Sequence, residues 1–198
     1  MMTPGAESAI RTACQAHIDL AARVAAEQAP MIARIADAMR ECLRSGRTIF
    51  WCGNGGSAAD SQHLAAELVG RFRSERRALC SIALTTDTSV LTAVGNDYGY
   101  DEVFSRQVEG LVRRDDLVFG LSTSGSSRNV LRAIQKAKAL DARTVGLLGR
   151  DGGPLRSMCE LSIVIPADDT ARIQEMHIMI GHILCDLVEQ DLFSNSGH

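Results

Sequence analysis

The 198-residue sequence lacks the features of secreted, membrane-spanning and nucleic-acid-binding proteins. Its first residues contain no basic stretch followed by an apolar one, so we expect no signal peptide. It has no apolar run long enough to cross a bilayer. The formal net charge is −3, with no block of like charges, which argues against a general attraction to nucleic acid. The densest basic cluster, residues 71–77, contains Glu75, and we interpret it as a solvated loop in preference to a phosphate contact.

The six cysteines form no CxxC pair, so the common zinc and redox motifs are absent. Most of them lie in apolar surroundings. We therefore expect buried free thiols of a cytoplasmic protein, with neither disulfides nor zinc–thiolate ligands.

The chain also has no internal repeat, linker or low-complexity tract, and its length and 45% hydrophobic content suit a single domain, residues 1–198. Helical periodicity predicts two helices, over residues 6–28 and 30–45. Pro30 suits the first turn of the second helix and Gly46 its end. Two helices before any strand predict an N-terminal helical arm, residues 1–46. Its apolar stripe needs a surface to cover it, such as a second copy of the chain.

From residue 47 onward, short apolar runs alternate with helical patterns. We expect strands at 48–52, 81–84, 116–121, 144–148 and 161–165. We expect helices at 57–69, 88–95, 101–112, 127–140, 154–158 and 170–192. Nearly continuous apolar strands separated by helices predict an α/β fold with a parallel sheet covered on both faces.

A glycine turn follows the first strand, at Gly53-Asn54-Gly55-Gly56. Glycine tolerates positive φ, and Ser57 can cap the helix that follows. A strand, a glycine turn and a helix N-terminus together present free backbone N–H groups to an anion. Such turns are also common in α/β proteins without any function.

The same helix carries His63 and Glu67, four residues apart and therefore on one face. They could form a metal site or an acid/base pair. The alternative is a solvated helix face with a local hydrogen bond.

A loop rich in hydroxyls, Ser122 to Ser127, lies between a buried strand and a helix. Its position at the carboxyl end of a strand is where open α/β sheets bind ligands. A helix cap at Ser127 needs only one hydroxyl, whereas this loop supplies five, so we favour phosphate binding. The loop has no P-loop lysine, and the chain has no GxGxxG motif. The last helix adds Gln174, His177 and His182 as polar candidates.

Five stretches together resemble the sugar isomerase (SIS) domain family, and within it the phosphoheptose isomerases. They are residues 52–60 (CGNGGSAAD), 63–67 (HLAAE), 91–99 (LTAVGNDYG), 122–127 (STSGSS) and 172–177 (RIQEMH), with His182 beyond. The resemblance covers nearly the whole chain. The sequence departs from the family at Arg76-Arg77, where family members often carry Arg-Pro. This departure concerns the geometry of the loop and not the chemistry.

The resemblance implies a five-stranded parallel sheet and a homotetramer with active sites at subunit interfaces. It implies one zinc ion per subunit, with His63, Glu67, Gln174 and His182 as ligands. The implied substrate-binding residues are Asn54, Gly55, Gly56, Ser57, Glu67, Asn96, Asp97, Ser122, Thr123, Ser124, Ser127 and Gln174. Gln174 and His182 are eight residues apart, about 12 Å along a regular helix. Both can bind the same ion only if their side chains converge, if the first turn of the helix is irregular, or if one of the ligands comes from another subunit.

The implied reaction converts D-sedoheptulose 7-phosphate to D-glycero-D-manno-heptose 7-phosphate through an enediol, in heptose biosynthesis for lipopolysaccharide, capsule or another glycoconjugate. Glu67 would be the base and His182 the acid that serves the oxygen. Two alternatives are a non-catalytic SIS scaffold that binds a replication initiator and an isomerase of another phosphosugar. Scaffold members tend to lack the carboxylate and the late histidine, whereas Glu67 and His182 are both present here.

Overall fold

The computed structural model describes residues 4–193, and residues 1–3 and 194–198 lie outside the description. The strands are β1 (Ile49–Gly53), β2 (Ser81–Ala83), β3 (Leu117–Ser122), β4 (Arg143–Gly149) and β5 (Leu161–Ile165). The helices are α1 (Pro4–Arg44), α2 (Gly56–Val69), α3 (Thr88–Asp97), α4 (Ser105–Leu111), α5 (Arg128–Ala139), α6 (Gly153–Met158) and α7 (Thr170–Phe193), with a 3-10 turn, η1 (Tyr100–Glu102).

The five strands form one parallel sheet in the order β2-β1-β3-β4-β5, which confirms the predicted fold class. β1 pairs with β2 on one side and with β3 on the other, so the direction of winding reverses between β1 and β3. Gly53 at the end of β1 is level with Leu121 near the end of β3. The loops after these two strands therefore emerge side by side, at the point where open α/β sheets bind ligands.

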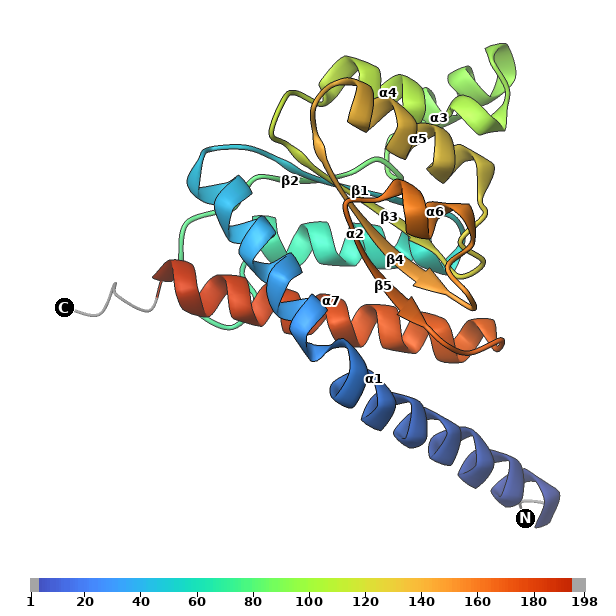
Figure 1. Ribbon diagram of the computed structural model, residues 1–198. Helices are drawn as coiled ribbons and strands as arrows, with labels where there is room; N and C mark the ends of the chain where they lie inside the picture. Colours follow the sequence, from blue (N-terminus) through green and yellow to red (C-terminus); the bar gives the residue numbers. More distant parts are fainter. Residues whose placement is uncertain (1–3, 194–198) are drawn as a thin grey trace.

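Helices cover both faces of the sheet (Figure 1). α1, α2 and α7 lie on one face, where the rings of Trp51 and Phe119 stack with centroids 4.1 Å apart. α3 to α6 lie on the other face, over Phe50 and Phe104. The residues of β1 and β3 are buried throughout because each strand has helices above and below it.

No helix among residues 4–193 combines the length and apolarity that crossing a membrane requires.

The expectation of two N-terminal helices is wrong, because α1 runs unbroken from Pro4 to Arg44 with Pro30 inside it. An internal proline costs a helix one hydrogen bond and about 3 kcal/mol. The second half of α1 offsets this cost by burying an apolar stripe that includes Ile35 and Met39. The first half of α1 projects away from the sheet as an arm (Figure 1), as predicted.

All six cysteines are free thiols, but only four are buried; Cys14 and Cys80 are exposed, contrary to expectation. Burial raises the pKa of the buried thiols to about 12, so they stay protonated at neutral pH. Cys14 lies in the first half of α1, which projects away from the sheet (Figure 1).

Candidate active site

The glycine turn is bonded through Asn54 to the start of α5, directly after the hydroxyl-rich loop. Asn54 Nδ2 donates to Asn129 Oδ1 at 2.9 Å, and Asn129 Nδ2 donates to Asn54 Oδ1 at 2.7 Å. The hydroxyl of Tyr100 also donates to Asn54 Oδ1, at 3.2 Å. These bonds join the turn after β1 to the start of α5 and to η1. Asn129 and Tyr100 were not singled out from the sequence, because neither belongs to a motif and only the fold brings them to Asn54.

The prediction that Ser57 caps α2 is wrong. The helix begins at Gly56 with Gly55 at the N-cap, and Gly55 has φ 55°, which favours glycine. Ser57 is 3% exposed and lies inside the first turn, packed on Gly53. The N–H groups of Ser57 and Ala58 donate to the carbonyls of Asn54 and Gly55, which leaves those of Gly55 and Gly56 to face a ligand.

The hydroxyls of the loop after β3 point toward one another. Ser122 Oγ lies 2.9 Å from Ser127 Oγ and 3.4 Å from Ser124 Oγ, and Ser126 Oγ donates to Ser124 Oγ at 3.0 Å. Ser127 occupies the N-cap position of α5, but its hydroxyl faces Ser122 and does not cap the helix. The loop therefore gathers hydroxyls at the N-terminus of a 12-residue helix, which suits a phosphate.

Gly125 is needed for the shape of this loop. Its φ is +65°, and an added Cβ would lie 2.1 Å from the carbonyl oxygen of Gly152. This close approach fixes the loop against the turn that precedes α6, where Leu155 N–H donates to Gly125 O at 3.1 Å. A hollow of about 670 Å³ opens beside the loop, lined in part by Ser124, Ser126 and Arg150.

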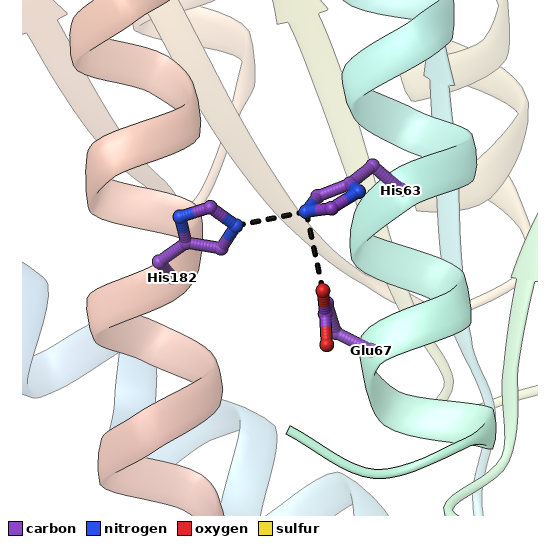
Figure 2. Close-up of side chains that lie close together, drawn as sticks. All are labelled: His63, Glu67 and His182. Carbon is purple, nitrogen blue, oxygen red and sulfur yellow. Dashed lines mark hydrogen bonds and ion pairs between the residues drawn. The ribbon is translucent and has the colours of Figure 1, made fainter. Parts of the chain in front are cut away.

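α2 and α7 lie side by side and bring His63, Glu67 and His182 together (Figure 2). His63 Nε2 lies 2.8 Å from His182 Nε2 and 3.2 Å from Glu67 Oε1. The spacing of four residues places His63 and Glu67 on one face of α2, and the packing of the helices adds His182 from 119 residues away. Side-chain exposures of 48% for His63 and 22% for Glu67 leave the cluster open to a ligand.

These three residues have donor atoms that fit a divalent metal ion. Their ligand atoms all lie within 4.8 Å of one another. Zinc with bonds of about 2.1 Å holds its ligand atoms roughly 3.4 Å apart, close to the observed separations. Two imidazole nitrogens and one carboxylate oxygen form a set that zinc accepts.

Gln174 does not join this cluster within one chain. Its side-chain amide lies over the start of α2, where an added Cβ on Gly56 would be 2.4 Å from Gln174 Nε2. Gly56 precedes His63 by seven residues, about 10 Å of helix rise. α7 is regular through this region, so neither convergence nor an irregular turn closes the gap. Gln174 thus lies beside the glycine turn of its own chain. Of the three ways in which Gln174 and His182 could bind one ion, only the supply of Gln174 by another subunit is compatible with this position.

Two other candidates lie apart from the cluster. Asn96 Nδ2 donates to Asp97 Oδ1 at 2.8 Å, at the exposed end of α3. His177 is fully buried, and neither ring nitrogen has a hydrogen-bond partner. His177 is therefore a core residue of α7, whereas His182 faces α2 (Figure 2).

Asp60 is a further polar residue on α2, one turn before His63. One of its carboxylate oxygens is inaccessible to solvent and has no hydrogen-bond partner. Burial raises the pKa of Asp60 to about 6, although His63 acts to lower it. The spacing of three residues could have indicated that Asp60 and His63 are neighbours, but not that the carboxylate is partly buried.

The basic segment after α2 is only partly the solvated loop that we expected. The side chains of Arg71 and Arg73 are 59% and 68% exposed. Arg76 is 1% exposed and pairs with Glu189 of α7 at 2.9 Å. The loop is held by this pair and by backbone hydrogen bonds, so its geometry does not depend on a proline at position 77.

Comparison with known proteins places these features in one family. The profile of the SIS domain matches residues 14–149. The phosphoheptose isomerase of Nitratiruptor sp. is 60% identical over 150 residues, which cover 76% of this chain and 80% of that protein. The phosphoheptose isomerase of Geotalea daltonii is 52% identical over 184 residues, covering 93% and 96%. The solved structure of phosphoheptose isomerase from Neisseria gonorrhoeae has a TM-score of 0.89 at 41% identity, covering 93% and 98%.

Proposed function

This chain belongs to the phosphoheptose isomerases of the SIS domain family, and we propose that it interconverts sedoheptulose 7-phosphate and D-glycero-D-manno-heptose 7-phosphate with Glu67 and His182 as the acid/base groups. The observation that supports these roles is the convergence of His63, Glu67 and His182 between α2 and α7. The reaction supplies heptose for a glycoconjugate. We place it in the cytoplasm, because a phosphorylated sugar does not cross a membrane unaided.

The hydroxyls of Ser122, Thr123, Ser124 and Ser127 bind the phosphate at the N-terminus of α5. Asn54 and the free N–H groups at Gly55 and Gly56 hold the sugar hydroxyls, with Ser57, Asn96, Asp97 and Gln174 as further contacts. Holding the phosphate away from the reacting carbons orients C1 and C2 toward the acid/base groups and lowers the entropic part of the barrier.

Glu67 takes the proton from C1 of the ketose, and the C1–H electrons form the C1–C2 double bond of the enediol. His182 gives a proton to O2 as the C2–O2 π bond breaks. For the aldose to form, Glu67 returns its proton to C2 and His182 removes the proton from O1, so the C1 carbonyl forms. No atom is lost or gained, as an isomerisation requires.

His63, Glu67 and His182 would hold a zinc ion, with Gln174 from another subunit as a fourth ligand. When bound, zinc would polarise the carbonyl and the adjacent hydroxyl. A carboxylate bound to zinc is a weaker base, so Glu67 would act on C1 when it is not coordinated, or else the ion would mainly organise the site.

Copies of the chain assemble as a homotetramer through the arm. Ile10 and Ile18 on the arm are 54% and 57% exposed, and apolar side chains of this size gain from burial.

The test is to incubate the purified protein with sedoheptulose 7-phosphate and to follow the aldose by NMR, with chelator and with added zinc. Product that vanishes with chelator and returns with zinc supports the isomerase and its metal site. Product indifferent to metal supports the isomerase and gives the ion a structural or adventitious role. No product from folded protein would refute the assignment and favour the scaffold or another phosphosugar.

Glu67→Gln tests the base directly. It preserves the size of the side chain but removes the proton acceptor, so we expect kcat to fall by about 10²- to 10⁴-fold. Glu75→Gln is the matched control, because that side chain is 91% exposed and lies outside the cluster of His63, Glu67 and His182. Near-normal turnover by Glu67→Gln would refute the assignment of the base.

A further inference from the structure

The segment between α2 and β2 is held to the end of α7 by a buried ion pair. Arg76 Nε donates to Glu189 Oε2 at 2.9 Å, and the two side chains are 1% and 3% exposed. A buried pair is costly unless its remaining donors and acceptors are satisfied. Here nearly all of them are.

Glu189 accepts three backbone hydrogen bonds besides the one from Arg76. They come from the N–H groups of Phe72 at 3.0 Å, Arg73 at 2.8 Å and Ser74 at 2.6 Å. Burial acts to raise the pKa of Glu189, but the three amides and the guanidinium outweigh it, so the pKa lies below its ordinary value. The carboxylate therefore remains charged at neutral pH and fixes the backbone of residues 72–74.

The other end of the Arg76 side chain binds the last turn of α2. Nη2 donates to the carbonyl of Glu67 at 2.8 Å, and Nη1 donates to the carbonyl of Leu68 at 2.8 Å. A cation at these carbonyls satisfies acceptors that the helix leaves free. Glu189 on α7 is thus connected, through Arg76, to the backbone of Glu67 on α2.

Phe72 connects the same carboxylate to His182. Its ring lies on the His182 imidazole with centroids 5.6 Å apart and an interplanar angle of 28°. Its backbone N–H is held by Glu189. A flat ring in this position limits how far the imidazole can turn away from His63 and Glu67.

We infer that Glu189 is a positioning residue for the isomerisation: it fixes Glu67 through Arg76 and His182 through Phe72. The inference rests on the acid/base roles proposed above. An apolar pair of similar size would often stabilise the fold as well as a buried ion pair or better. A positioning role explains why Arg76 and Glu189 are nevertheless found beside the reacting groups.

Kinetics of four variants, one of them a surface control, test this role. In Phe72→Leu we expect kcat to fall about 10- to 100-fold, because small displacements of a reacting group have effects of this size. We expect KM to stay within about twofold, because the phosphate loop is untouched. Phe72→Tyr keeps the ring and should retain kcat. Glu189→Gln should lower kcat in the same way as Phe72→Leu, while Glu160→Gln, a surface ion-pair control, should not.

NMR of the imidazole protons separates this inference from the proposed function, since it needs no activity. An aromatic ring shifts the resonances of protons above its face, so the His182 signals should move in Phe72→Leu. They should also move in Glu189→Gln if Glu189 holds Phe72, whereas the His17 signals should stay. His182 signals unchanged in folded Glu189→Gln would overturn the inference. If that variant does not fold, a normal kcat in Phe72→Leu would overturn it instead.

Discussion

His177 shows at the scale of one residue how strongly burial changes a side chain. It is fully buried on α7, and neither ring nitrogen has a hydrogen-bond partner. Burial lowers its pKa to about 4, although the nearby backbone of Leu148 opposes the shift. His177 is therefore neutral in the folded protein at physiological pH.

The lowered pKa of His177 predicts a loss of stability in acid. The unfolded chain binds this proton near pH 6.5 and the folded chain near pH 4, so stability falls as the pH drops through this range. Between pH 7 and pH 5 the loss should be about 2 kcal/mol. His177→Met removes the titrating group. Its free energy of unfolding, measured by urea denaturation, should therefore fall by about 2 kcal/mol less than that of the wild type between pH 7 and pH 5.

Met176→Leu is the control, because it alters the neighbouring core position without changing a titratable group. It should shift stability equally at both pH values. Parallel pH curves for the wild type and His177→Met would contradict the burial of a neutral histidine.

At the scale of elements, the packing of α2 against α7 determines the site. The two helices approach closely at Gly181, where an added Cβ would lie 2.5 Å from Leu64 Cδ2. Leu64 is fully buried and so cannot swing aside freely. These two residues are sequence neighbours of His182 and His63, so the spacing of the helices there also sets the distance between the imidazoles.

Gly181→Ala tests this contact. Overpacking should cost about 1–3 kcal/mol, offset by up to ~1 kcal/mol of better helix propensity. Leu64→Ala alone should cost about 2–5 kcal/mol by leaving a cavity. The double variant should lose less stability than the sum of the two, because the new methyl group occupies part of that cavity.

Urea denaturation of the four proteins gives the coupling free energy, and kcat should fall in Gly181→Ala even where the protein remains folded. Additive losses would show that α2 and α7 do not meet at these residues.

At the scale of the whole molecule, the arm of α1 exposes apolar side chains that the rest of the chain does not cover. Ile18→Asp places a charge in the proposed subunit contact and should shift the proposed homotetramer toward smaller species in sedimentation velocity. Leu111→Asp, at an exposed apolar position on α4, is the matched control and should leave assembly unchanged. A wild-type chain that sediments as a monomer would contradict the proposed assembly.

The sequence by itself determined the sheet, because apolar runs between helical patterns can be buried only as parallel strands covered on both faces. It also determined the chemistry of both loops and the pairing of His63 with Glu67, because residue type and a spacing of four residues are local properties. It misjudged Pro30 and Ser57, since tertiary packing outweighs the local cost of a proline and a glycine N-cap replaces the serine.

Only the tertiary structure decided which distant residues meet. The packing of α2 on α7 added His182 to His63 and placed Gln174 at the glycine turn, because the relative position of two helices depends on contacts such as Gly181 with Leu64. It also buried Arg76 against Glu189. Such contacts have no period in the sequence, so periodicity and spacing could not indicate them. The resemblance to the SIS domain family implied that His182 joins His63 and Glu67, but it did not indicate the buried pair of Arg76 and Glu189.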